Sequence, residues 1–408
     1  MSYSIAMLSV HTSPLDTPGR TRDAGGMNVY IQELARELGQ SQNTIDIFTR
    51  RTNEFSPNIV QLTPHVRVIH IQAGPSTPVH KHDLYQYLPA FAQGIDEFRS
   101  SEDTPYDILH SHYWLSGVAA MQLARRWDVP HITMFHTLGR LKQLANPNEI
   151  EPSIRLEMER WLIQQADRII ASTDEERMQI IRHCGATPGH VQVIPCGVDL
   201  KRFLSQDRQQ AREKLGLKRH QPVLLFVGRL DPFKGPDLLL RAAAMMEQDA
   251  QVVIVGGKTT GDKEIQQLRV LAAQLKISKR VLFTGARPQQ ELPMIYSAAD
   301  VTVIPSYHES FGLAAVESLA CSTPVVATRA GGLTTVVRHG ETGYLVPRCP
   351  GFFAERLDTL LKNPDLLEYM RLAARPSVLQ FSWKNVACQV RDVYEDAISE
   401  EARCLVAQ

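Results

Sequence analysis

Glu309 and Glu317 stand eight positions apart in the stretch HESFGLAAVESLACSTPVV, which covers residues 308–326. Carboxylates at this spacing can form the polar face of an ordinary helix, or an acid and a base of the kind that glycoside hydrolysis uses. They can also belong to a ligand site, in which carboxylates and the unpaired amides of a helix start face one ligand. The spacing by itself does not choose among these three interpretations.

The segment before the two glutamates favours a ligand site. The strand pattern VTVIPS precedes them, so a helix is expected to begin a few residues later. On this placement Glu309 lies outside the helix and Glu317 lies in its second turn. The first amides of the helix would then be available to an anion, namely those of Phe311, Gly312 and Leu313.

Two other segments carry groups that suit a phosphate. The buried strand in PVLLFVGRLDPFKG breaks at Gly228, and Arg229 and Lys234 follow at once as a candidate diphosphate clamp. Gly25 and Gly26 stand just before a helix of 3.6-residue period, where the backbone can approach a phosphate closely. The alternatives are two solvated loop cations and a glycine turn that only geometry requires.

The strand and helix patterns that must position these groups occur twice along the chain. Short apolar runs alternate with helical patterns, which is typical of doubly wound α/β domains with parallel sheets. Such sheets bind ligands at the carboxyl ends of their strands, and two of them in series imply a cleft between domains. The runs are IAMLSV, IDIFTR, VRVIHI, DILHSH, HITMFH and RIIAST, then VLLFVG, QVVIVGG, VLFTGA, VTVIPS, PVVAT and GYLVP.

Domain boundaries follow from composition and turn residues. Pro195 and Gly197 come after the last strand pattern of the first set and before a polar helical stretch. We therefore predict a first domain over residues 1–195 and a second over residues 196–383. A C-terminal helix over residues 384–408 is expected to pack back toward the first domain.

Composition excludes several classes of protein. A chain of 408 residues that is 43% hydrophobic and 22% charged is globular, with about two domains. Its 44 basic residues balance 44 acidic ones, which disfavours nucleic acid and anionic membranes as partners. Because there is no long apolar stretch and the six cysteines lack any CxxC spacing, we expect a cytoplasmic protein with reduced thiols, no membrane span and no metal cluster.

Five ordered motifs resemble those of retaining GT-B glycosyltransferases that use nucleotide sugars. They are DAGGMNVYIQELAREL, HSHYWLSG, FHTLGRLK, FVGRLDPFKG and ESFGLAAVES. The resemblance covers nearly the whole chain and implies two Rossmann-like domains that face each other across a cleft. These motifs are most similar to those of enzymes with a phosphorylated acceptor, namely single-domain bacterial sucrose-phosphate synthases and the inositol-phosphate N-acetylglucosaminyltransferase of mycothiol synthesis.

The resemblance implies that the second domain binds the diphosphate of the donor. Arg229 and Lys234 match the family's cationic clamp, helped by the Gly26 loop and by the amides around Gly312 and Leu313. Preorganised cations and amides stabilise the charge that builds on a departing diphosphate, so these groups are expected to carry much of the rate.

The rest of the donor is assigned in the same way. Glu317 resembles the carboxylate that accepts both ribose hydroxyls, and Arg287 is similar to a residue that touches the uracil. Glu309 matches the carboxylate that holds the transferred hexose, and His136 the histidine that lies near the reacting carbon. A core histidine at a strand end is the alternative for His136.

Four residues match the family's binding site for an acceptor phosphate, and they are Lys81, Tyr113, Thr137 and Arg155. Each by itself would pass for a surface or core residue. Together they supply two cations and two hydroxyls from separate segments, as a dianion requires. They favour a phosphorylated acceptor over a growing polysaccharide.

The resemblance implies a retaining transfer, and we predict that glucose passes from UDP-glucose to fructose 6-phosphate, giving sucrose 6-phosphate and UDP. The alternative is transfer from UDP-N-acetylglucosamine to inositol phosphate, and a noncatalytic nucleotide-sugar-binding protein is a more remote one. ADP in place of UDP stays open. The chain has no Asp-x-Asp triplet, so we expect no obligatory metal or cofactor. A separate sucrose-phosphate phosphatase is an expected downstream partner.

Overall fold

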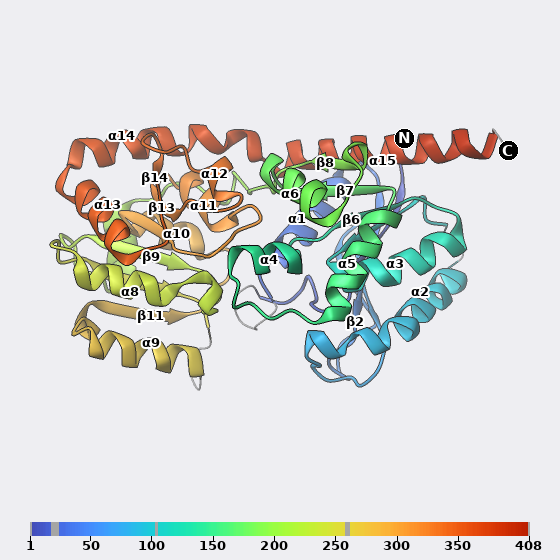
Figure 1. The fold of residues 1–408 in the computed structure, drawn as a ribbon, viewed down its shortest axis with the longest axis horizontal. Coiled ribbons are helices and arrows are strands. Elements are labelled where there is room, and N and C mark those ends of the chain that lie inside the picture. The colour runs from blue at the N-terminus through green and yellow to red at the C-terminus, as the bar shows by residue number, and fades with distance from the viewer. Residues whose placement is uncertain (1, 18–23, 103–104, 258–261, 407–408) are drawn as a thin grey trace. The chain divides into compact units, whose positions relative to one another are not determined.

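The computed structural model describes residues 2–17, 24–102, 105–257 and 262–406. Contacts divide the chain into two units, each built on one sheet (Figure 1). The first unit comprises Met1–Asp16, Met27–Pro195 and Trp383–Gln408, and the second comprises Thr17–Gly26 and Cys196–Ser382. The grouping of residues 24–26 with the second unit was not predicted from the sequence.

The first unit contains an eight-stranded sheet in the order β3-β4-β2-β1-β5-β6-β7-β8. All neighbours are parallel except β3, which pairs antiparallel with β4 at the edge and was not predicted. The six strands named by the first set of apolar runs are confirmed. The strands are β1 Ser4–Ser9, β2 Thr44–Arg50, β3 Ile59–Thr63, β4 Val66–Ile71, β5 Ile108–His112, β6 His131–Met134, β7 Arg168–Ala171 and β8 Val191–Val193.

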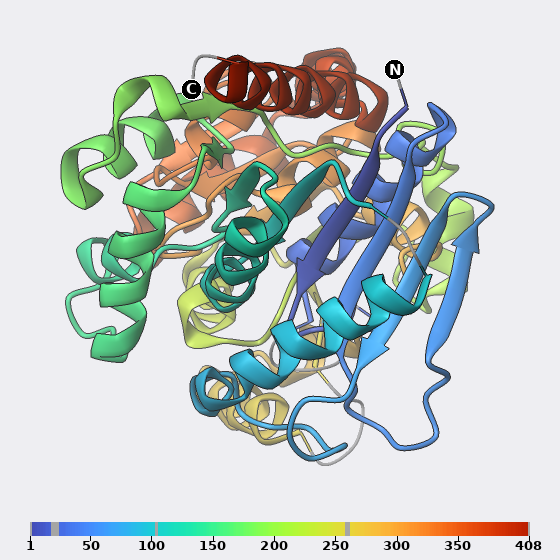
Figure 2. The same cartoon turned by 90° about the vertical axis from the view of Figure 1, so that its right-hand side faces the viewer.

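Helices cover both faces of this sheet, and α2 crosses one face in Figure 2. Helix α1 buries Tyr30, Ile31, Leu34 and Leu38, the apolar positions of its 3.6-residue period. The helices are α1 Gly26–Gln40, α2 Leu88–Glu102, α3 Trp114–Trp127, α4 Gly139–Ala145, α5 Ser153–Gln165 and α6 Asp174–Cys184, with short 3-10 turns η1 Lys81–Asp83, η2 Tyr85–Tyr87 and η3 Pro188–His190.

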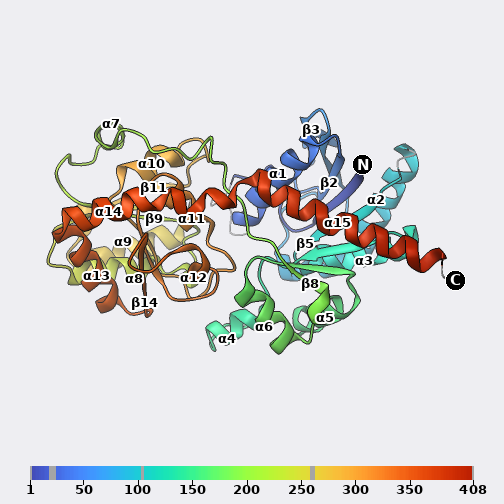
Figure 3. The same ribbon diagram turned by 90° about the horizontal axis from the view of Figure 1, so that it is seen from above.

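The last helix, α15 (Trp383–Val406), belongs to the first unit although it follows the second in sequence (Figure 3). Its Trp383 ring lies 5.4 Å from the ring of Tyr30 in α1. The hydroxyl of Tyr394 shares a hydrogen bond of 2.6 Å with Nδ1 of His110 in β5. These contacts connect the C-terminal helix to the interior of the first sheet.

The second unit contains a six-stranded, all-parallel sheet in the order β11-β10-β9-β12-β13-β14. All six strand runs predicted for this half are confirmed. They are β9 Val223–Val227, β10 Gln251–Val255, β11 Val281–Gly285, β12 Val301–Ile304, β13 Val325–Thr328 and β14 Gly343–Val346. The two sheets with their helices confirm the α/β class and the doubly wound architecture.

The helices of the second unit connect these strands and pack on the sheet. A core of buried side chains joins helices and strands, among them Leu224, Leu239, Ile254, Val303 and Phe353. The helices are α7 Arg208–Lys214, α8 Pro236–Met245, α9 Lys263–Gln274, α10 Leu292–Ala298, α11 Leu313–Ala320, α12 Leu333–Val336, α13 Pro350–Lys362 and α14 Pro364–Ala374, with 3-10 turns η4 Pro232–Lys234, η5 Ser278–Arg280 and η6 Pro376–Phe381.

Each sheet has a point at which the chain reverses its direction of strand addition. In the first sheet this point lies between β1 and β5, and in the second between β9 and β12. Open parallel sheets bind ligands outside the carboxyl ends of the strands at such a point. Among the candidate residues, Tyr113 follows β5, Arg229 follows β9 and Glu309 follows β12.

No helix in the described part of the chain has the length and apolar character to cross a bilayer. The five cysteines with described side chains are free thiols. Cys404 lies outside the residues whose side chains are described.

Candidate functional site

In the second unit, Lys234 and Glu309 form an ion pair at the carboxyl ends of β9 and β12. The Nζ atom of Lys234 lies 2.7 Å from both carboxylate oxygens of Glu309, and Ser306 Oγ donates to Oε1 at 2.7 Å. Burial by itself raises the pKa of Glu309, but the charge and hydrogen bonds of Lys234 and Ser306 outweigh burial and lower it. Glu309 is therefore an ionised acceptor. Since an ammonium has three donors, Lys234 keeps one for a ligand oxygen.

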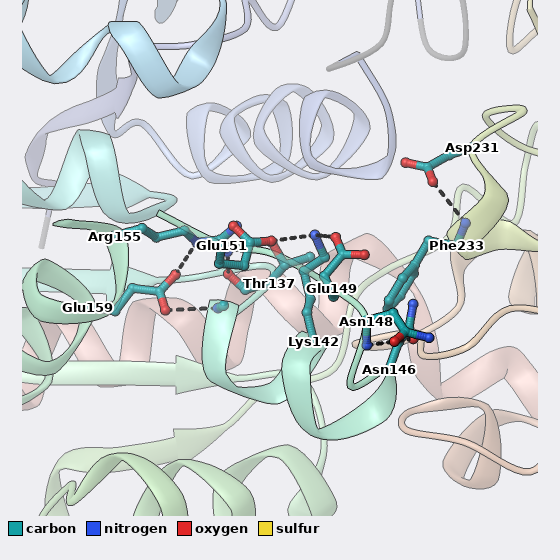
Figure 4. A network of polar contacts seen from close by, with 11 residues as sticks. Thr137, Lys142, Asn146, Asn148, Glu149, Glu151, Arg155, Glu159, Asp231 and Phe233 are labelled. Atoms are coloured by element: carbon teal, nitrogen blue, oxygen red, sulfur yellow. Dashed lines mark hydrogen bonds and ion pairs between the residues drawn. The ribbon is translucent and has the colours of Figure 1, made fainter. Parts of the chain in front are cut away.

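Short turns fix the loops that carry this pair. Asp231 starts the η4 turn by accepting a hydrogen bond from the amide of Phe233 at 2.8 Å (Figure 4). The carbonyl of Phe233 accepts from the amide of Tyr307 at 2.9 Å, which links the two loops. Gly235 follows η4 with φ 72°, and a Cβ there would lie 2.5 Å from the carbonyl oxygen of Pro305. A side chain at this position would separate the loops.

The loop with Glu309 rests on a glycine pair that the sequence analysis missed. The amide of Gly332 donates to the carbonyl of Glu309 at 2.7 Å. A Cβ on Gly331 would lie 2.2 Å from that carbonyl oxygen, and one on Gly332 2.4 Å from Cα of Phe311. The two adjacent glycines after β13 are visible in the sequence, but only the fold shows that the loop with Glu309 packs against them.

The helix after Glu309 begins as predicted. Gly312 is the N-cap of α11 with φ 100°, so Glu309 precedes the helix and Glu317 lies in its second turn. The ring of Phe311 is buried against Phe381 with centroids 5.3 Å apart, so its backbone amide is the group that could bind a ligand. The first amides of a helix have no intrahelical acceptor, so this start suits an anion.

Glu317 is buried and lies among neutral hydrogen-bond donors. Its Oε2 accepts from Tyr296 Oη at 2.8 Å, and its Oε1 accepts from Gln289 Nε2 at 3.3 Å. Burial raises the pKa of Glu317 to about 7, against the lowering effect of these two hydrogen bonds. Each oxygen has a further lone pair, so the carboxylate can accept two more hydroxyls.

This raised pKa predicts a pH dependence of stability. The protonated form of Glu317 favours the folded state. Its stabilisation is complete below the ordinary pKa of 4.5 and is lost as the pH rises through about 7. The loss is on the order of 3 kcal/mol at pH 8. We expect Glu317→Gln to be more stable than the wild type at pH 8 and nearly equal at pH 4.5 by calorimetry of the ligand-free protein. Glu291→Gln is the control, since the side chain of Glu291 is 44% exposed. An equal pH profile for wild type and Glu317→Gln contradicts the assignment.

The other residues predicted to bind the donor lie near the same strand ends. A Cβ on Gly25 would lie 3.8 Å from Cδ and Nε of Arg229, so the arginine stem runs beside this glycine. A Cβ on Gly26 would lie 2.9 Å from Cδ1 of Leu313. Arg287 follows β11 and pairs with Glu291 at 3.3 Å, with 38% of its side chain exposed.

In the first unit, two strained residues mark the carboxyl ends of β5 and β6. Tyr113 has φ 75° and His136 has φ 57°, backbone angles that residues other than glycine seldom adopt. The amide of Thr137 donates to the carbonyl of Phe135 at 2.6 Å, which closes a three-residue turn around His136. Such strain concentrates at functional sites because the surroundings must hold it in place.

His136 belongs to a row of neutral aromatic groups. Its Nε2 shares a hydrogen bond of 3.0 Å with Nδ1 of His112, whose ring lies 4.3 Å from that of His110. Burial lowers the pKa of His136 and of His110 to about 3 and that of His112 well below its ordinary value. The edge of Tyr30 packs on both His112 and His136. His136 is thus an uncharged hydrogen-bonding group. The two histidines beside it, His110 and His112, lie in the HSHYWLSG motif, but no role was predicted for them from the sequence.

Arg155 is the centre of a buried ionic network in the first unit (Figure 4). Its Nε donates to Glu159 at 2.6 Å, its Nη1 to Glu151 at 2.8 Å, and its Nη2 to the carbonyl of Thr137 at 2.8 Å. Lys142 contacts the other oxygen of Glu151 at 2.5 Å and also pairs with Glu149. The sequence analysis named Arg155 and missed both of its carboxylate partners.

Three of the four residues predicted for an acceptor phosphate lie together. The guanidinium of Arg155 lies 5.0 Å from the ring centroid of Tyr113, and its Nη2 lies 3.3 Å from Oγ1 of Thr137. Lys81 is in η1, apart in sequence from the other three. Arg155, Tyr113 and Thr137 therefore form one group in the first unit.

No group of three or more histidine, cysteine or acidic side chains is arranged to hold a metal ion within the part of the chain that the structure describes.

Comparison with protein families agrees with this arrangement. Residues 24–202 match the model of glycosyltransferase family 4, and residues 207–376 match that of the glycosyl transferases group 1. The chain belongs to the group 1 glycosyltransferases and has their GT-B fold. The resemblance seen in the five sequence motifs is confirmed.

Individual relatives fall into two groups by name. The D-inositol 3-phosphate glycosyltransferase 2 of Catenulispora acidiphila is 44% identical over 98% of this chain and 96% of its own length. That of Corynebacterium diphtheriae is 40% identical over 99% of this chain and 97% of its own length. Among solved structures, sucrose-phosphate synthase from Thermosynechococcus elongatus has a TM-score of 0.91 and 32% identity, covering 98% of this chain and all of its own.

Proposed function

We propose that the protein transfers a sugar from a nucleotide-sugar donor to a phosphorylated polyol, with D-inositol 3-phosphate as the first candidate acceptor. The observation that supports a phosphorylated acceptor is the grouping of Arg155, Tyr113 and Thr137 at the strand ends of the first unit. The choice of inositol follows from relatives of that name at 40 to 44% identity over nearly the full chain. The donor in this proposal is UDP-N-acetylglucosamine.

Fructose 6-phosphate with UDP-glucose remains the second candidate. It was the first expectation from the sequence, but the curated relatives carry the name of the alternative acceptor. The structural likeness to a sucrose-phosphate synthase at 32% identity keeps it in consideration. A separate phosphatase would follow the enzyme only in this second case. A cytoplasmic location belongs to the proposal in both cases, since nucleotide sugars and phosphorylated acceptors are soluble metabolites.

The proposed chemistry retains the anomeric configuration. The acceptor hydroxyl attacks on the face from which the nucleoside diphosphate departs, and a phosphate oxygen of the leaving group takes its proton. Lys234, Arg229 and the start of α11 stabilise the charge on the diphosphate. Glu317 accepts hydrogen bonds from the ribose hydroxyls, and Glu309 accepts hydrogen bonds from the hexose hydroxyls. Neutral His136 donates or accepts a hydrogen bond at the hexose without adding a charge.

The test is a panel of donors and acceptors analysed by mass spectrometry. UDP-glucose, ADP-glucose and UDP-N-acetylglucosamine are each combined with D-inositol 3-phosphate, inositol and fructose 6-phosphate, with and without a chelator. We expect a glycosylated inositol phosphate from UDP-N-acetylglucosamine, no product from free inositol, and no effect of the chelator. A disaccharide phosphate formed only from fructose 6-phosphate would select the second candidate. Nucleotide binding without any product would contradict both.

A further inference from the structure

The guanidinium of Arg155 has no donor that reaches solvent as the structure stands. Its side chain is 1% exposed, and its three nitrogens are bound by Glu159, Glu151 and Thr137. The proposed acceptor phosphate can contact Arg155 only if one of these partners moves away. The partner that moves determines how the acceptor site opens.

The three partners differ in how firmly they are held. Thr137 uses its backbone carbonyl, and Glu159 is fixed on α5 by a second hydrogen bond, 2.8 Å from the amide of Gly139. Glu151 precedes α5 in a loop, and within the described part of the chain the hydrogen bonds of its two carboxylate oxygens go to the side chains of Arg155 and Lys142. Glu151 can leave Arg155 and stay neutralised by Lys142. It is the partner that exchanges at the lowest cost.

Exposure increases outward through the same residues. The side chain of Glu151 is 2% exposed, that of Lys142 is 19% exposed and that of Glu149 is 26% exposed. The chain of contacts from Arg155 through Glu151 to Lys142 and Glu149 (Figure 4) thus passes from buried to partly exposed side chains.

We propose that Glu151 is an exchangeable counter-ion which an acceptor phosphate displaces from Nη1 of Arg155. This inference rests on the proposed function, because it takes the acceptor to carry a phosphate. Two cations and three carboxylates make the network net negative, so the resting site opposes anions. A ligand with a single negative charge would take the place of Glu151 with a group of equal charge, so its interaction with Arg155 would be no stronger. A phosphate dianion brings a second negative charge and a third oxygen, and Glu151 therefore sets a preference for dianionic acceptors.

The decisive variant is Glu151→Gln, which keeps the shape of the side chain and removes its charge. We expect the KM for the phosphorylated acceptor to fall about tenfold, because a neutral amide holds the guanidinium more weakly than a carboxylate does. The KM for the donor should stay within about twofold. Inorganic phosphate, titrated into the full chain by calorimetry, should also bind Glu151→Gln about tenfold more tightly than the wild type.

The matched control is Glu149→Gln, which removes the same charge from the same lysine but does not touch Arg155. Its acceptor KM should change less than about twofold. An unchanged or higher acceptor KM in Glu151→Gln, or an equal gain in Glu149→Gln, overturns the exchange. If neither phosphorylated acceptor is turned over by the wild type, the proposed function fails, and the phosphate titration alone then decides whether Glu151 blocks an anion site.

Discussion

Lys234→Met is expected to lower turnover of the nucleotide-sugar donor by a factor on the order of 10² to 10³. The variant removes a preorganised cation from the departing diphosphate in the proposed reaction. It also leaves the carboxylate of Glu309 without its partner at 2.7 Å, so the pKa of Glu309 should rise. The effect should appear mainly in kcat, because the charge on the leaving group grows only during the reaction. Steady-state kinetics with saturating acceptor measure it.

A double variant separates chemistry from folding. Lys234→Met combined with Glu309→Gln removes the unpaired carboxylate and should regain the thermal stability lost in Lys234→Met, measured by calorimetry. Turnover should not recover, because the cation is still missing. Lys362→Met is the control, since Lys362 pairs with Glu247 on the surface of the same unit. A double variant that recovers turnover would mean that Lys234 acts only by holding the fold.

Arg155→Met is expected to lower the free energy of unfolding of the first unit by about 3 to 5 kcal/mol. The substitution fills the volume of the stem but leaves two carboxylates, Glu151 and Glu159, buried without their shared cation. All four tryptophans belong to this unit, at positions 114, 127, 161 and 383. Urea unfolding followed by tryptophan fluorescence therefore reports on the first unit selectively.

Two companions test the physical cause. Adding Glu151→Gln to Arg155→Met should restore part of the lost stability, because it removes one of the two stranded charges. Arg125→Met is the control, since Arg125 is exposed on α3, donates to the neutral amide of Gln165 and lies 5.7 Å from the ring centroid of Trp161. Its effect should be below about 1 kcal/mol. A loss in Arg155→Met no larger than in Arg125→Met would contradict the network as a source of stability.

The local patterns of the sequence were sufficient for most of the fold. Twelve apolar runs became twelve strands because strands buried on both faces must be apolar nearly throughout. Gly312 and the turn before it fixed the start of α11, and so the different positions of Glu309 and Glu317. The edge strand β3 was missed because its side chains are partly exposed and mix polar with apolar residues.

The candidate site was predictable as a list of residues but not as a set of interactions. The sequence assigned Lys234 and Glu309 to different parts of the donor, whereas the structure pairs them. It named Arg155 as a cation for an acceptor phosphate and predicted no partner for it in the protein, whereas two carboxylates hold it, four positions before and four after it along the chain. The periodicity of α5 was compatible with either outcome, because the same spacing on an exposed helix leaves the charges in water.

What the sequence determined by itself was the class of fold, the family and the residues that follow each strand, since these depend on short-range patterns and ordered motifs. What only the tertiary structure decided was which charges are buried, which carboxylate neutralises which cation, and that Tyr394 of the last helix reaches His110 in the first sheet. Such pairings depend on elements far apart in the chain. Their energies depend on burial, and burial exists only once the chain has folded.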